Sequence, residues 1–93
     1  MLVSLLVRGI PKGGHMSLNE HTIEYEPDNK VIASMWRFSI PYQEIEEVQQ
    51  HRIFLFLHIL TIKLKNDTKY KFLVYRKTVK NNIDEKLLYK QDR

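Results

Sequence analysis

The sequence of 93 residues contains no cysteine, which excludes disulfide bonds and any mechanism that depends on a thiol nucleophile. Proline and glycine are scarce, with three of each, and the chain has no repeat, linker or low-complexity segment. Hydrophobic residues make up 43% of the sequence, a share that is typical of globular proteins rather than disordered ones. We therefore expect a single domain over residues 1–93.

Long hydrophobic runs are also missing. The apolar stretch at residues 1–7 ends at Arg8, Gly9 and Pro11, without the charged start, longer apolar core and cleavage site of a secretory signal. A membrane-spanning helix needs about 20 apolar residues, and the sequence offers none. We expect a cytoplasmic protein that is either soluble or peripheral at the membrane.

Signatures of catalysis are lacking as well. No HExxH, GxSxG or phosphate-loop pattern occurs, and four histidines are scattered along the chain: His15, His21, His51 and His58. The glutamates at positions 44, 46 and 47 have no histidine beside them, so we interpret them as a solvated edge. The sequence therefore predicts no enzymatic activity, no metal site and no cofactor.

Charge is distributed unevenly along the chain. Residues 1–51 hold four Lys and Arg against seven Asp and Glu, a net charge of −3, whereas residues 52–93 hold eleven against four, a net charge of +7. The C-terminal half thus provides a basic side, which is either an ordinary solvated surface or a surface that attracts anionic partners.

Residues 57–75, LHILTIKLKNDTKYKFLVY, show the clearest pattern in the sequence. Apolar and polar residues alternate with a period of two on both sides of Asn66 and Asp67, which predicts a β-hairpin with its even-numbered residues inside. A three-residue loop is favoured because it pairs residues that face the same way, Leu64 with Tyr70 and Ile62 with Phe72.

This register places four lysines on the outer face of the hairpin. Like charges opposite each other are destabilising, so the arrangement is either tolerated or covered by something anionic. The candidate anion-binding or lipid-binding residues are Lys63, Lys65, Lys69 and Lys71.

Residues 53–57, IFLFL, show no alternation, and an extended chain here sends apolar side chains to both faces. Two interpretations remain open: a strand that is buried on both sides or in a self-association interface, and a loop tip that dips into lipid beside Arg52. The candidate residues for membrane insertion or for an oligomer interface are Ile53, Phe54, Leu55 and Phe56.

The rest of the chain is consistent with about seven strands within residues 2–76 and one helix near residues 78–91. We expect strands at residues 2–7, 15–18, 22–26, 31–40 and 49–53, with a glycine loop at residues 11–14. Thr78 suits the helix N-cap, and apolar residues recur at Val79, Ile83 and Leu87, widened by Leu88.

Three segments in this order, GGHMSLNEHTIEYEPDN, FSIPYQEIEEV and LTIKLKNDTKYKFLVYR followed by the helix, resemble the pleckstrin-homology (PH) superfold in its GRAM and bacterial PH-like branch. The resemblance implies a mostly β, PH-like barrel of two packed antiparallel sheets, capped by a C-terminal helix. It also implies a binding or scaffolding module, without implying a phosphoinositide ligand.

The expected function is therefore a non-catalytic interaction module that contacts a protein partner or a second copy of itself, as a homo-oligomer. The alternative is peripheral binding to anionic membrane lipid through the basic hairpin and the apolar segment. Nucleic-acid binding is disfavoured, because Tyr70 points inward in the expected register and the lysine face has no aromatic row of its own.

Overall fold

The computed structural model describes residues 1–76 and 78–91 and contains seven strands, two α-helices and one 3₁₀ turn within them. The strands are β1 (Leu2–Val7), β2 (Ile10–Leu18), β3 (Thr22–Pro27), β4 (Phe38–Pro41), β5 (Ile45–Phe54), β6 (Leu57–Leu64) and β7 (Lys69–Val74). The helical elements are α1 (Lys30–Trp36), η1 (Tyr42–Glu44) and α2 (Val79–Gln91).

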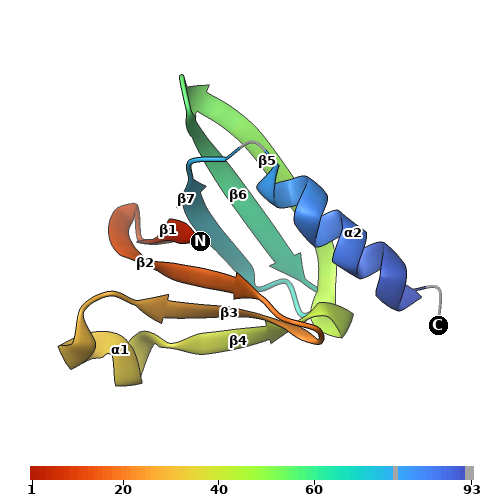
Figure 1. The fold of residues 1–93 in the computed structure, drawn as a ribbon, viewed down its shortest axis with the longest axis horizontal. Helices are drawn as coiled ribbons and strands as arrows, with labels where there is room; N and C mark the ends of the chain where they lie inside the picture. The colour runs from red at the N-terminus through yellow and green to blue at the C-terminus, as the bar shows by residue number, and fades with distance from the viewer. Residues whose placement is uncertain (77, 92–93) are drawn as a thin grey trace.

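All seven strands belong to one antiparallel sheet with the order β4-β3-β2-β1-β7-β6-β5. The sheet curls into a half-barrel, and α2 lies along its open side next to β5 (Figure 1). The expected mostly β fold with a C-terminal helix is confirmed. The expectation of two separate packed sheets is wrong, because β1 pairs with β2 on one side and with β7 on the other and so joins the two halves.

The concave side of the sheet holds the core. Leu60, Ile62 and Phe72 are fully buried, which confirms that the even-numbered residues of this hairpin face inward. From α2, Val79 and Ile83 complete the core. Leu88, expected to widen the buried stripe of the helix, is instead exposed.

Aromatic rings from β3, β4 and β7 form a cluster in the interior. The rings of Phe38 on β4 and Tyr70 on β7 stack at 4.8 Å, and Tyr25 lies 5.4 Å from Phe38 and 5.8 Å from Phe72. Such ring pairs stabilise by about 0.5–1.5 kcal/mol beyond their buried area. The cluster therefore links one end of the sheet to its middle across the concave side.

Residues 11–14 form part of strand β2 rather than the expected loop. Inside the sheet, position 14 has to be glycine because its neighbours leave no room for a side chain. A Cβ atom at Gly14 would lie 2.8 Å from the ring of Tyr25 and 2.5 Å from the Glu26 carbonyl oxygen. The missing side chain lets the Tyr25 ring lie across β2, where its hydroxyl donates to the Lys12 carbonyl at 2.7 Å. Burial, with a smaller contribution from the charge of Asp28, raises the pKa of Tyr25.

Residues 31–40 are not the single strand that we expected. They hold most of helix α1, and β4 begins only at Phe38. Asn29 caps the helix, since its side-chain oxygen accepts a hydrogen bond from the Val31 N–H at 2.9 Å. The N-cap bond satisfies one backbone donor that a helix start leaves without a partner.

The hairpin between β6 and β7 has a three-residue loop as expected, but the loop starts one residue earlier. Ile62 pairs with Tyr70 and Leu60 with Phe72, so the predicted pairs of Leu64 with Tyr70 and Ile62 with Phe72 are wrong. The Leu64 N–H donates to the Thr68 carbonyl and the Asp67 N–H donates to the Leu64 carbonyl, at 2.8 and 3.0 Å. Asp67 takes the positive φ of 71° that such a loop requires.

One glutamine fastens α2 to the sheet. The side-chain oxygen of Gln50, on β5, accepts from the Lys80 N–H at 2.8 Å, and its amide nitrogen donates to the Arg76 carbonyl at 3.0 Å. A residue of the sheet thus provides a hydrogen-bond partner for the first turn of α2. Within the helix, Lys80 forms an ion pair with Asp84, four residues further on.

The two neighbouring glycines of β2 provide a matched test of the close packing at Tyr25. We expect Gly14→Ala to destabilise the domain by roughly 1–3 kcal/mol, the range for overpacking a well-filled site. Gly13→Ala should change stability by much less, because a Cβ there meets only the Asp28 carboxylate at 3.7 Å. Thermal or urea unfolding measures both variants, and equal losses would contradict this packing.

Candidate functional site

The connection between β5 and β6 projects from one end of the sheet (Figure 1) and is apolar and exposed. We call Ile53–Phe56 the apolar tip; the exposed fractions of its four residues are 46%, 68%, 65% and 79% in chain order. The tip is therefore not buried within this chain. Leu55 sits in the turn with a φ of 29°, so the backbone bends sharply and spreads the side chains outward.

Basic groups flank the apolar tip. Arg52 and His51 precede it on β5, and His58 lies opposite Arg52 on β6. The Arg52 and His51 side chains are exposed, and His58 is half-buried. The surface around the tip is thus apolar at its end and basic at its base.

The four predicted lysines lie at the other end of β6 and on β7. Lys63 is directly opposite Lys69, and Lys71 is opposite Thr61 rather than another lysine. Lys65 lies in the loop, where its N–H donates to the Glu44 carbonyl at 2.9 Å. We call these four residues the lysine cluster; the structure brings three of them onto the outer face of two strands and puts the fourth in the loop.

Carboxylates of the same chain neutralise part of the lysine cluster. Lys63 Nζ lies 3.4 Å from a Glu46 carboxylate oxygen and 3.8 Å from one of Asp67. Glu47 is paired with Lys63 in the register of β5 and β6. The repulsion between Lys63 and Lys69 is therefore offset from within the fold, by residues that the sequence only suggested to be a solvated edge.

The apolar tip and the lysine cluster are far apart. Leu57 borders the tip. Lys71 is level with Thr61, four residues further along β6, and Lys63 is six residues further, which at 3.3 Å per residue puts them about 13 and 20 Å away. The range of electrostatic interactions at physiological salt is only about 8–10 Å. A flat surface that receives the tip end-on would thus lie beyond the reach of the lysine cluster.

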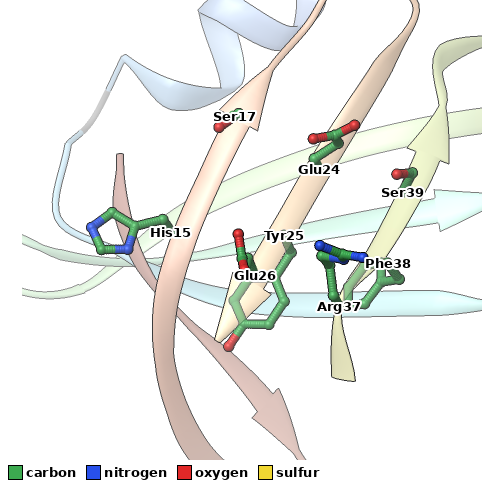
Figure 2. A pocket seen from close by; sticks show the side chains of 8 residues that line it. All are labelled: His15, Ser17, Glu24, Tyr25, Glu26, Arg37, Phe38 and Ser39. Carbon is green, nitrogen blue, oxygen red and sulfur yellow. The ribbon is translucent and has the colours of Figure 1, made fainter. Parts of the chain in front are cut away.

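A polar hollow of about 520 Å³ lies on strands β2, β3 and β4, on the part of the sheet opposite to the tip (Figure 2). Glu26 lies between His15 and Arg37, and Glu24 lies between Ser17 and Ser39 (Figure 2). His15 Nδ1 is 2.7 Å from an Asp28 carboxylate oxygen, and both side chains are more than half exposed. These groups are open to solvent, and their arrangement is that of an acidic surface.

A second hollow, of about 530 Å³, borders the acidic surface on its β1 side and is mostly apolar. It is lined by Met1, Leu2, His15, Tyr75 and Arg76. Leu2 and Tyr75 are 62% and 53% exposed. One feature of the sequence indicates this hollow: both apolar side chains stand at outward positions, where polar residues are expected.

Within residues 1–76 and 78–91, no group of three or more His, Asp or Glu side chains is arranged to hold a metal ion. In the same part of the chain, no helix has both the length and the apolar character needed to cross a bilayer. His51 and His58 lie on the neighbouring strands β5 and β6 at the base of the tip, whereas His15 and His21 lie on β2 and in the β2–β3 turn.

Comparisons with known proteins find a similar fold but indicate no function. No protein-family model matches the sequence, and no curated protein matches it. The structure is similar to the crystal structure of the C-terminal domain of an unknown protein from Leishmania infantum, with a TM-score of 0.78 and 14% sequence identity, over 94% of this chain and 79% of that chain. A likeness at this level of identity shows the fold alone.

The loop between β6 and β7, which adjoins the lysine cluster, allows a test of the turn geometry. We expect Asp67→Gly to leave stability nearly unchanged, because glycine adopts the positive φ without steric cost but loses more backbone entropy on folding. The lost contact of Asp67 with Lys63 is solvent-exposed, with 87% of the Asp67 side chain accessible, and exposed pairs contribute little. Asp67→Ala is the matched control and should destabilise; urea unfolding that gives the reverse order would contradict the turn.

Proposed function

We propose that this chain is a non-catalytic, cytoplasmic interaction module that binds protein, including a second copy of itself, through the apolar tip. The observation that carries the proposal is the exposure of four consecutive apolar residues, Ile53–Phe56, at a projecting turn. Single exposed apolar residues are ordinary, but a contiguous exposed patch is typical of interaction sites.

The energetics support a contact surface at the tip. Complete burial of one large apolar side chain is worth about 1.5–3 kcal/mol, so two phenylalanines and two aliphatic residues can drive a specific contact. Aromatic side chains dominate such contacts when they reach a fitted pocket. The domain folds without burying these residues, since its core is complete without them.

The architecture is consistent with the PH-like resemblance of the sequence. Seven antiparallel strands in one curled sheet and a C-terminal helix on the open side support assignment to a PH-like or GRAM-like module of the binding and scaffolding kind. The resemblance and the apolar tip together favour an interaction role over catalysis.

Peripheral binding to anionic membrane is the second candidate. It is favoured by the apolar tip with Arg52 at its base, which is suited to shallow insertion beside anionic headgroups. It is disfavoured by the position of the lysine cluster, about 13 Å or more from the tip along the strands, and by the acidic partners of Lys63. Protein contact therefore has the stronger support.

We expect the double variant Phe54→Ser, Phe56→Ser to lower self-association without lowering stability, since both side chains are exposed in the monomer. Sedimentation velocity over a concentration series measures association, and thermal unfolding measures stability. Ile10→Ser is the matched control, because Ile10 is similarly exposed, at the β1–β2 turn. A wild-type chain that stays monomeric at millimolar concentration would count against self-association.

Membrane binding gives a different result in vesicle sedimentation. If the second candidate holds, the wild-type chain sediments with phosphatidylserine-containing vesicles more than with neutral ones, and added salt releases it. The same tip variant should then lose vesicle binding, whereas Lys69→Glu with Lys71→Glu should retain most of it because these lysines lie far from the tip. Equal recovery with acidic and neutral vesicles would exclude the candidate.

A further inference from the structure

Strands β1, β7 and β6, which are neighbours in the sheet, are largely apolar on both faces. One set of alternate residues is buried in the core, and the other set faces outward on the convex side of the sheet. Strands that read as near-continuous apolar runs are typical of sheets that are covered on both sides. We call the outward set the convex apolar face; its members are Leu2, Leu6, Leu57, Ile59, Leu73 and Tyr75.

The strand registers bring these side chains into one area. Leu73 on β7 is paired with Ile59 on β6. The same registers, continued to the ends of the strands, put Tyr75 between Leu57 and Leu2. The main contacts of α2 are with β5 and η1, and those of α1 are with β3 (Figure 1). Within residues 1–76 and 78–91, neither helix therefore covers the convex apolar face.

The charged residues that stand with this face are basic. On the outward side of β1, β6 and β7, every charged residue is a lysine: Lys63, Lys69 or Lys71. Two carboxylates neutralise Lys63, but no carboxylate of the described residues is paired with Lys69 or Lys71. At the opposite end of the face, Arg76 lines the apolar hollow. The convex apolar face thus has positive charge at both ends.

We propose that the convex apolar face binds an amphipathic α-helix of another protein, with acidic residues at both ends of the apolar stripe of that helix. Apolar side chains of the helix cover the face and enter the hollow beside Tyr75. Its acidic residues meet Lys69 and Lys71 at one end of the face and Arg76 at the other. This surface is separate from the apolar tip, so the inference goes beyond the proposed function and does not depend on it.

The dimensions of the face match those of one helix. Tyr75 and Lys69 are six residues apart on β7, which at 3.3 Å per residue is about 20 Å. A helix rises 1.5 Å per residue, so about 13 residues span that length. From β6 to β1 there are two strand spacings, or about 10 Å, which is the width of one helix.

A helix fits this face better than a bilayer does. The side chains of Leu6, Leu57, Ile59 and Leu73 are half-buried, so they do not project far enough to insert into lipid. The face is also the convex side of a curled sheet (Figure 1), and a flat bilayer would touch only its crest. A helix that lies parallel to the strands follows that crest over its whole length.

Two synthetic helical peptides of equal length test the charge pattern. Both have the same apolar stripe, and one carries glutamates at its two ends where the other carries lysines. We expect the glutamate peptide to shift the amide NMR signals of Leu73, Tyr75 and Lys71, and its affinity to fall as salt is raised. The lysine peptide should bind at least about ten-fold more weakly, because its charges repel those of the face.

A charge reversal on β7 sharpens the test. Lys69→Glu with Lys71→Glu should weaken binding of the glutamate peptide about ten-fold or more and should strengthen binding of the lysine peptide. Arg52→Glu with Lys86→Glu is the matched control, since it makes the same change in net charge at exposed positions away from this face. The control should produce neither effect, and thermal unfolding verifies that each variant is folded.

Further variants separate the apolar contacts of this face from those of the tip. Leu2→Ser with Tyr75→Ser should weaken both peptides about ten-fold, whereas the tip variant Phe54→Ser, Phe56→Ser should bind the glutamate peptide as the wild type does. Loss of binding in the tip variant, or no shift of the β7 amide signals at millimolar peptide, would overturn the inference and leave the proposed function standing. Phosphatidylserine vesicles that shift these signals when the glutamate peptide does not would also overturn it, in favour of a lipid surface.

Discussion

The stacking of Phe38 on Tyr70 is the contact on which the shape of the molecule depends. Phe38 belongs to an outermost strand, β4, and Tyr70 to β7, with three strands between them in the sheet order. Rings on a flat sheet at that separation would be about 19 Å apart at the usual strand spacing, instead of the 4.8 Å observed. The sheet must therefore curl, and the curl makes the concave side that α2 fills and the convex side that stays exposed.

A curled sheet that does not close has two end strands, and the contacts that these two strands make are different. The short strand β4 is held by the aromatic cluster and by the η1 turn, where the Tyr42 hydroxyl donates to the Asn19 carbonyl at 2.8 Å. The long strand β5 extends past the core and ends in the apolar tip. The tip contributes nothing to the core, so its apolar composition is a property of the surface, and this is the observation on which the proposed binding role rests.

Sequence periodicity predicted which side chains of β6 and β7 face inward, because alternation reports facing directly. It did not fix their register, since pairings shifted by one residue on each strand keep the same facing. Helix α1 was missed although Asn29 and the apolar residues at positions 31, 32, 35 and 36 have helical spacing, because the alternation of Trp36, Phe38 and Ile40 also suits a strand. The apolar hollow depends on β1 lying beside β7, a contact between distant segments that no local pattern reports.

The double hydrogen bond of Gln50 ties the last helix to the strand that carries the tip. One amide holds both the Arg76 carbonyl and the first turn of α2, so the helix cannot lift from the sheet without breaking both of these bonds to the middle of β5. Amide protons in α2 and in the central part of β5 are therefore expected to exchange with solvent as one cooperative unit. A partner that binds the tip and makes β5 more rigid would therefore slow amide exchange in α2, although it does not contact that helix.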